Sequence, residues 1–180
     1  YFRNIFKQYI HPNDKTLDYL RLKESEILKG KGRVLGILCR GTDYVITKPK
    51  NHPVQPDVTE VIKDARQVMK EQRCDYVFVA TEDQDLLAAL KAEFGEKLLS
   101  LDQRRYSCKN MCSDQMLAQV KEKDGERNPT KDALDYLAAI YLLTDRKSTR
   151  PELQSHSDLV CRLLLEKKKE RKKKKKIYLP

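Results

Sequence analysis

Two short apolar runs constrain the fold of this chain more than any other feature of its sequence. They are RVLGILC at residues 33–39 and DYVFVAT at residues 75–81. A continuous apolar run is typical of a strand that is buried on both faces, because no polar face alternates along it. Between the two runs, residues 57–73 show the apolar spacing of a helix. A strand, a helix and a second buried strand together predict a parallel pair with a crossover helix.

The same alternation of strand and helix continues along the chain. We predict helices over residues 14–29, 83–95 and 130–144, and a short third strand at residues 97–101. This order predicts an α/β fold with a Rossmann-like, doubly wound parallel sheet over residues 33–144. Because the chain begins at Tyr1 rather than Met, we expect residues 1–32 to be the helical end of a missing N-terminal region.

The positive charge of the chain is concentrated in its last 36 residues. The chain carries 37 Lys and Arg against 27 Asp and Glu, a net charge of +10, and residues 145–180 hold 13 of the basic and 5 of the acidic side chains. The remaining body is close to neutral, so we expect no nucleic-acid partner for it. Residues 145–150, 152–156 and 158–168 can be back-translated into a common short-read sequencing adapter, and the lysine run after them into poly-A. We therefore expect residues 145–180 to be adapter-derived; the alternative is a disordered Lys-rich tail.

Hydropathy bears on the cellular compartment, whereas cysteine usage is uninformative and leaves only the default of free thiols. No run approaches 18 apolar residues, so we expect no membrane span, and no signal-peptide pattern is present. Cys108 and Cys112 lie four residues apart without a second pair or a nearby His, and a zinc site needs four ligands, so we expect no zinc site there. Free thiols in a reducing compartment follow, and we predict a cytoplasmic location without a metal.

The segment after the first predicted strand, CRGTDY at residues 39–44, contains the sharpest candidate for a binding site. In an open parallel sheet, ligands bind beyond the carboxyl ends of the strands. The guanidinium of Arg40 is a planar fork of donors that suits a pair of phosphates. Gly41 allows close approach of a ligand to the backbone, and Thr42 and Asp43 can hold the turn. The alternative is a surface salt bridge between Arg40 and Asp43.

Other candidates follow the second and third strands or lie on the long loop. Glu82 and Asp83 can bind sugar hydroxyls or orient the arginine, although Asp83 also fits the N-cap of the next helix. His52 precedes a proline and can face a donor or act as a base, or it is only solvated. The Arg104–Tyr106 segment can extend a phosphate or acceptor surface, or it is a solvated basic loop. No GxGxxG or Walker segment is present, which disfavours dinucleotide and NTPase functions.

Taken in order, four segments of the chain resemble the fucosyltransferase superfamily, over about residues 33–144. The resemblance is greatest to bacterial relatives of α-1,6-fucosyltransferases and Nod-factor fucosyltransferases, and protein O-fucosyltransferases are more distant. Many relatives have two consecutive arginines with a His two residues before the first, where this chain has Gly41 and Leu38. The segments are GILCRGTDY, NHPVQPDVTEVIKDA, DYVFVATEDQDLLAALKAEFG and LAAIYLLT.

The resemblance implies a function and roles for individual residues. It implies the incomplete nucleotide-binding half of a GT-B glycosyltransferase that transfers fucose from GDP-fucose to a glycan acceptor with inversion, usually without metal. Arg40 matches the family arginine that contacts the donor diphosphate, and Asp43 matches the acidic residue three positions later. Glu82 and Asp83 match the family's acidic pair, and His52 belongs to the connecting loop. Because most of the acceptor half is absent, we expect this chain by itself to be inactive.

Two other classes of function remain open from the sequence. A nucleic-acid-binding protein would bind through the basic tail, with an affinity that falls steeply with salt. A non-catalytic Rossmann-like module would bind GDP without transferring a sugar.

The origin of the basic tail can be checked by resequencing the source DNA across the codon for Thr144. We expect the reading frame to continue into a further strand and a Ser/Thr-rich segment, as the resemblance implies. Lysine codons in the genomic DNA at this place would contradict an adapter origin.

Overall fold

The computed structural model describes residues 8–9, 11–41, 56–107, 109, 117–125 and 127–144. In this part of the chain three strands form one sheet with all strands parallel and in the order β1-β2-β3. Three predicted site residues and the basic tail lie outside the described residues: Thr42, Asp43, His52 and residues 145–180. The strands are β1 (Val34–Leu38), β2 (Tyr76–Ala80) and β3 (Leu98–Ser100).

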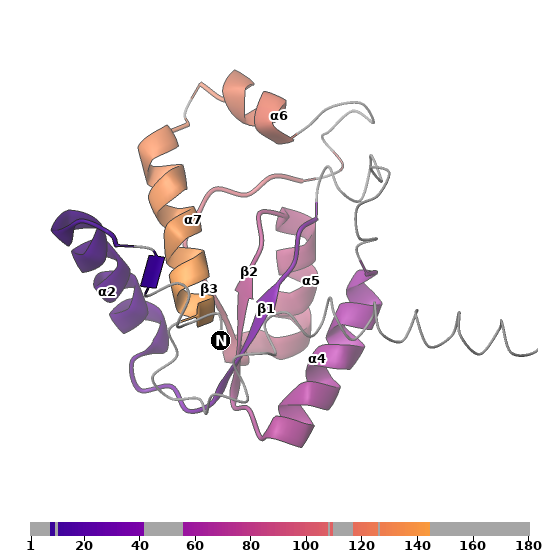
Figure 1. Ribbon diagram of the computed structural model, residues 1–180. Coiled ribbons are helices and arrows are strands. Elements are labelled where there is room, and N and C mark those ends of the chain that lie inside the picture. The colour runs from indigo at the N-terminus through magenta and orange to yellow at the C-terminus, as the bar shows by residue number, and fades with distance from the viewer. Residues whose placement is uncertain are drawn as a thin grey trace, which may run out of the picture.

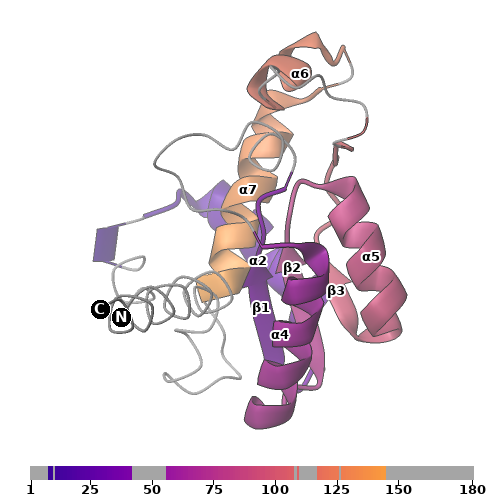
Figure 2. The ribbon, with the colours of Figure 1, turned by 90° about the vertical axis from the view of Figure 1, so that its right-hand side faces the viewer.

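Helices cover both faces of this sheet (Figure 1). The crossover helices α4 (Val58–Gln72) and α5 (Gln84–Phe94) pack on one face, and α2 (Asp14–Leu28) and α7 (Pro129–Thr144) pack on the other. Figure 2 shows α4 in front of the sheet and α7 behind it. The predicted Rossmann-like α/β arrangement is confirmed, because the parallel strands alternate with helices along the chain.

Each face of the sheet has its own hydrophobic core, because successive side chains of a strand point to opposite faces. On the side of α2 and α7, Phe78 is the largest fully buried side chain and packs in one cluster with Leu20 and Leu142. On the side of α4 and α5, Ile37 and Val79 pack with residues of both helices. Burial on both faces explains why the two strands are apolar along their whole length.

Side-chain caps fix where the helices begin. Asn13 accepts a hydrogen bond from the amide of Thr16 at 2.9 Å and begins α2. Asp57 accepts from the amide of Thr59 at 2.7 Å and begins α4. At the other end of α5, Gly95 has a φ of 53°, which a glycine adopts readily. A further helix, α6 (Leu117–Lys123), lies in a segment that the sequence predicted to be only polar.

A buried carboxylate joins α2 to α7. Asp135 is only 3 % exposed, and it accepts hydrogen bonds from the hydroxyl of Tyr19 on α2 and from Nζ of Lys131 one turn earlier on α7. Burial, and then the hydrogen bond and the negative charge of Asp135, raise the pKa of Tyr19 well above its usual range. The neutral phenol is therefore the form that the folded protein stabilises.

The Tyr19→Phe variant tests this contact. At neutral pH we expect it to lower the free energy of unfolding by about 1–3 kcal/mol, because Oδ1 of Asp135 loses a donor. The folded protein binds the phenolic proton more tightly than the unfolded chain, in which the pKa is about 10. The stabilisation is therefore complete below pH 10 and lost as the pH rises above that value. Urea unfolding from pH 7 to 11 should show the two proteins converging.

Tyr9→Phe is the matched control, because Tyr9 is 68 % exposed whereas Tyr19 contacts a buried carboxylate. It should behave as the wild type at every pH. A stability difference between Tyr19→Phe and the wild type that stays constant up to pH 11 would contradict the role given to the hydroxyl.

Candidate functional site

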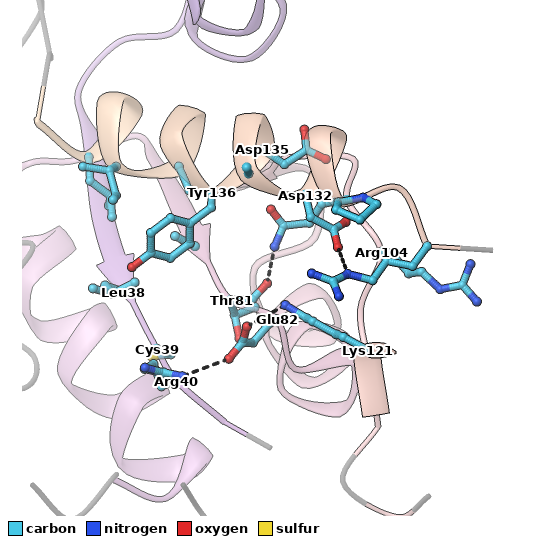
Figure 3. A pocket seen from close by; sticks show the side chains of 18 residues that line it. Leu38, Cys39, Arg40, Thr81, Glu82, Arg104, Lys121, Asp132, Asp135 and Tyr136 are labelled. Carbon is cyan, nitrogen blue, oxygen red and sulfur yellow. Dashed lines mark hydrogen bonds and ion pairs between the residues drawn. The ribbon is translucent and has the colours of Figure 1, made fainter. Parts of the chain in front are cut away.

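A cleft of about 470 Å³ opens at the carboxyl ends of β1 and β2 (Figure 3). Its walls come from these strand ends, from the segment after β3, and from α6 and α7. The volume lies in the range of roughly 300–1,000 Å³ that small-molecule sites occupy. The position is the one where open parallel sheets bind ligands.

The register of the two strands brings Arg40 and Glu82 together. Leu38 of β1 lies opposite Ala80 of β2, so the residues two positions further along each strand end side by side. Nη2 of Arg40 is 3.6 Å from Oε1 of Glu82. Nζ of Lys121, on α6, is 3.4 Å from Oε2 of the same carboxylate. Glu82 therefore lies between two cations, and all three side chains line the cleft (Figure 3).

Gly41 and Asp83 pack against each other beside this cluster. Asp83 is buried, and its Oδ1 accepts hydrogen bonds from the amides of Asp85 and Leu86 at 2.8 and 3.0 Å. Asp83 is thus the N-cap of α5, as its position in the sequence allowed. Its Oδ2 would lie only 2.0 Å from a Cβ atom at position 41. A glycine is therefore needed at position 41, because any side chain would collide with the carboxylate of Asp83. The sequence interpretation had given a different reason for this glycine, namely close approach of a ligand to the backbone.

The backbone that carries Glu82 is held on both sides. The amide of Tyr106 donates to the carbonyl of Glu82 at 3.0 Å, and the amide of Gln84 donates to the carbonyl of Tyr106 at 3.0 Å. The side chain of Gln103 donates to the carbonyl of Thr81 at 3.0 Å. Hydrogen bonds of this kind fix the turn after β2, so the carboxylate of Glu82 projects from a rigid position.

The three residues after β3 that the sequence singled out have different roles. Arg104 lines the cleft and forms an ion pair with Asp124, 2.5 Å from Nε to Oδ2. The guanidinium of Arg105 turns inward and donates to the carbonyls of Leu101 and Gln103, and its burial lowers its pKa. Tyr106 donates its hydroxyl to Asp124, and burial together with that hydrogen bond raises its pKa. Only the first of the three is placed to contact a ligand in the cleft.

One wall of the cleft is apolar and accessible. Leu38, at the end of β1, is 46 % exposed, and Tyr136, on α7, is 68 % exposed. Figure 3 shows the ring of Tyr136 extending from α7 toward Leu38. We call these two residues the apolar wall. The remaining apolar lining comes from the ends of β1 and β2 and from α7, namely from Cys39, Ala80, Pro129, Ala133, Ala139, Ile140 and Leu143.

The structure brings together the four predicted site residues that it describes, Arg40, Gly41, Glu82 and Asp83. The roles predicted for Thr42, Asp43 and His52 stay predictions, because these residues lie outside the described part of the chain. Sequence reasoning missed Lys121 because α6 has no clear apolar stripe, and it missed Tyr136 because that residue lies on the exposed side of α7.

Within the described residues, no group of three or more His, Cys, Asp or Glu side chains is placed to hold a metal ion. Nor does any helix in the same part of the chain have the length and apolar character needed to cross a membrane. Comparison of the chain with protein-family models, with curated proteins and with solved structures found no match.

The contact between Gly41 and Asp83 predicts a large effect of a single methyl group. Gly41→Ala should lower the free energy of unfolding by about 1–3 kcal/mol, because the new Cβ overlaps the buried carboxylate. Asp83→Gly should restore most of that stability in the double variant, since glycine is a tolerated N-cap. Thermal and urea unfolding measure both effects.

Gly125→Ala provides the control, because no atom of the described residues lies within 4 Å of a Cβ atom built at position 125. We expect it to leave stability unchanged within about 0.5 kcal/mol. Equal effects of the two alanine substitutions would show that the contact at Gly41 does not constrain the turn.

Proposed function

We propose that this chain is the nucleotide-binding part of a glycosyltransferase of the GT-B kind that transfers fucose from GDP-fucose to a glycan acceptor with inversion. The proposal rests on one observation above all, the placement of Arg40. Arg40 is the second residue after the buried parallel strand β1. Its side chain lines the cleft at the edge of the sheet and is about half exposed. The sequence resemblance of this same segment to fucosyltransferases supplies the reaction.

A cation at this place suits the chemistry of the proposed transfer. When the bond between the sugar and the diphosphate breaks, negative charge develops on the leaving nucleoside diphosphate. A positioned guanidinium stabilises that charge more in the transition state than in the bound donor, which is what accelerates the step. Two parallel N–H groups can bind two phosphate oxygens, which a lysine ammonium does less specifically.

The neighbours of Arg40 support the same use of the cleft. Lys121 offers a second cation from the opposite wall, 3.4 Å from Glu82. Glu82 pairs with both cations and neutralises part of their charge. In the proposed complex its carboxylate also accepts a hydrogen bond from a sugar or ribose hydroxyl, since an ionised carboxylate can only accept.

Asp43 belongs to the proposal as the second catalytic candidate, three residues after Arg40. Its role, like those of Thr42 and His52, rests on the sequence alone, because these residues lie outside the described part of the chain. Asp83 contributes indirectly, since its Oδ1 is used to cap α5 and its Oδ2 faces Gly41.

Binding of GDP to the Arg40→Ala variant tests the proposal. By isothermal titration at physiological salt, we expect the affinity to fall between about tenfold and a hundredfold, the range for loss of a hydrogen bond to a charged group. In an enzyme that also contains the acceptor half, fucose transfer should fall at least as much. Arg40→Lys should recover only part of the loss, because it lacks the planar fork.

Arg66→Ala is a closely matched control for this experiment. Arg66 is 64 % exposed beside a 22 % exposed Glu93, and Arg40 is 49 % exposed beside a 23 % exposed Glu82. Both variants lose one positive charge, so any general attraction of GDP to the basic chain changes equally. Equal GDP affinities for the two variants would refute the role of Arg40, and no GDP binding by the wild type would refute the proposed function.

A further inference from the structure

We propose that the edge of the sheet where the three strands begin binds the surface of an anionic phospholipid bilayer. Basic side chains in the segments that lead into the strands contact the lipid headgroups. The inference concerns the edge opposite the cleft and does not depend on the proposed function. We call these residues the basic edge, namely Lys29, Lys31, Arg33, Lys70, Arg73 and Lys97.

The parallel topology brings the basic edge together. Parallel strands begin at the same edge of a sheet, so the segments that precede them meet there. They are residues 29–33 before β1, residues 70–75 from the last turn of α4 to the start of β2, and residues 95–97 before β3. Figure 1 shows the starts of β1 and β2 at one end of the molecule and α6, which borders the cleft, at the other. A partner at the basic edge therefore leaves the cleft open.

Contacts hold the three segments side by side. Nη1 of Arg33 donates to the carbonyl of Gln72 at 3.0 Å, and Nζ of Lys31 lies 4.6 Å from the centre of the Tyr76 ring. The pairing of β2 with β3 begins one residue after Tyr76 and Lys97, so these two residues are neighbours across the strands. The basic side chains thus form one surface, although they come from three separate parts of the sequence.

The positive charge of this surface is not neutralised within the described part of the protein. The same three segments contain the acidic residues Glu71, Asp75 and Glu96. Oδ2 of Asp75 accepts the amide of Arg33, and Oε1 of Glu71 accepts from Gln67. No member of the basic edge forms an ion pair with another described residue, whereas the basic residues that line the cleft are all ion-paired. An excess of unpaired charge on one face creates a potential that attracts an anionic partner.

Four of these cations are available to a partner outside the protein. The helices α2, α4 and α5 end at this edge, and their last carbonyls attract cations, as the hydrogen bond from Arg33 shows. The side chains of the other members except Lys31 are exposed and make no hydrogen bond or ion pair to a residue that the structure describes. They are Lys29, Lys70, Arg73 and Lys97.

A bilayer surface fits this arrangement of charges better than a nucleic acid does. Anionic lipids diffuse within the membrane, so they can gather beneath each cation and avoid the exposed carboxylates of Glu71 and Glu96. The phosphates of a nucleic acid have a fixed spacing, and some of them would face these carboxylates. Long lysine side chains also reach the headgroups without requiring that the backbone approach them closely.

The experiment measures cosedimentation of the full chain with vesicles of equal parts phosphatidylcholine and phosphatidylserine at about 0.1 M salt. A triple variant with Lys29→Gln, Lys70→Gln and Lys97→Gln should bind about a hundredfold more weakly, because one lysine near an anionic surface contributes roughly fivefold. Replacing the same three lysines by arginine keeps the charges and should preserve wild-type binding. Vesicles of phosphatidylcholine alone should bind none of these proteins.

The matched control is a second triple variant with Lys15→Gln, Lys63→Gln and Lys123→Gln. These lysines are exposed on α2, α4 and α6, and none of them belongs to the segments before the strands. Both glutamine triples lose three positive charges and carry the same basic tail, so any effect of net charge is equal. The control should bind the vesicles nearly as the wild type does, and circular dichroism should show that both variants fold.

Four results would overturn the inference. They are absence of wild-type binding to the anionic vesicles, equal vesicle affinities of the two glutamine triples, a larger loss for a short DNA duplex than for vesicles, and a loss of thermal stability without a loss of vesicle binding. The third would mean that the edge recognises nucleic acid, and the fourth that its lysines only stabilise the helix ends. GDP binding should be the same in both triples, so these results are separate from the test of the proposed function.

Discussion

The parallel pairing of β1 with β2 is the interaction on which the rest of this structure depends. Its hydrogen bonds place Leu38 opposite Ala80, and the amide of Cys39 continues the ladder by donating to the carbonyl of Ala80 at 3.1 Å. Parallel strands end at the same edge of a sheet, so whatever follows them meets there. The contact between Arg40 and Glu82 is a consequence of this register, because a shift by one residue would move each side chain to the opposite face.

A glycine and an aspartate meet at each end of β1. At its start, a Cβ atom at Gly32 would lie 2.2 Å from Oδ2 of Asp75, and that oxygen accepts from the amide of Arg33 at 2.9 Å. At its end, Gly41 meets the cap of α5 in the same way. The two carboxylates, Asp75 and Asp83, lie in the segments before and after β2. Each packs against a glycine beside β1 and also accepts backbone hydrogen bonds. The entry and exit of β1 are therefore fixed by contacts with β2.

The sequence was sufficient to predict the framework, and the reason is visible in particular residues. Ile37 and Val79 are buried in strands that helices cover on both faces. The sequence of each of these strands is therefore apolar without interruption. The caps Asp57 and Asp83 act within a few residues of their own position and can be recognised locally. Arg40 could be predicted as a site residue because a charged side chain directly after a buried strand has only the sheet edge to occupy.

The parts that sequence reasoning missed depend on contacts between distant segments. Lys121 reaches the cleft only because α6 lies beyond the strand ends, and a helix of seven residues has little stability of its own. The apolar wall combines Leu38 with a residue of α7 that lies almost a hundred positions later. Neither pattern is periodic, so no local property of the sequence distinguishes these residues from an ordinary exposed lysine or tyrosine.

The cleft has one side that is held by the sheet and another that depends on polar contacts. Arg40 and Glu82 project from strand ends whose backbone is held by the ladder and by Tyr106. Lys121 belongs to α6, and the segment that follows this helix is held by Asp124, which receives both the guanidinium of Arg104 and the hydroxyl of Tyr106. The two cations that flank Glu82 therefore differ in how firmly they are positioned. The backbone that carries Arg40 is the more firmly held of the two, since α6 is a helix of only seven residues. Under the proposed function, this difference favours Arg40 over Lys121 as the group that sets the position of a bound diphosphate.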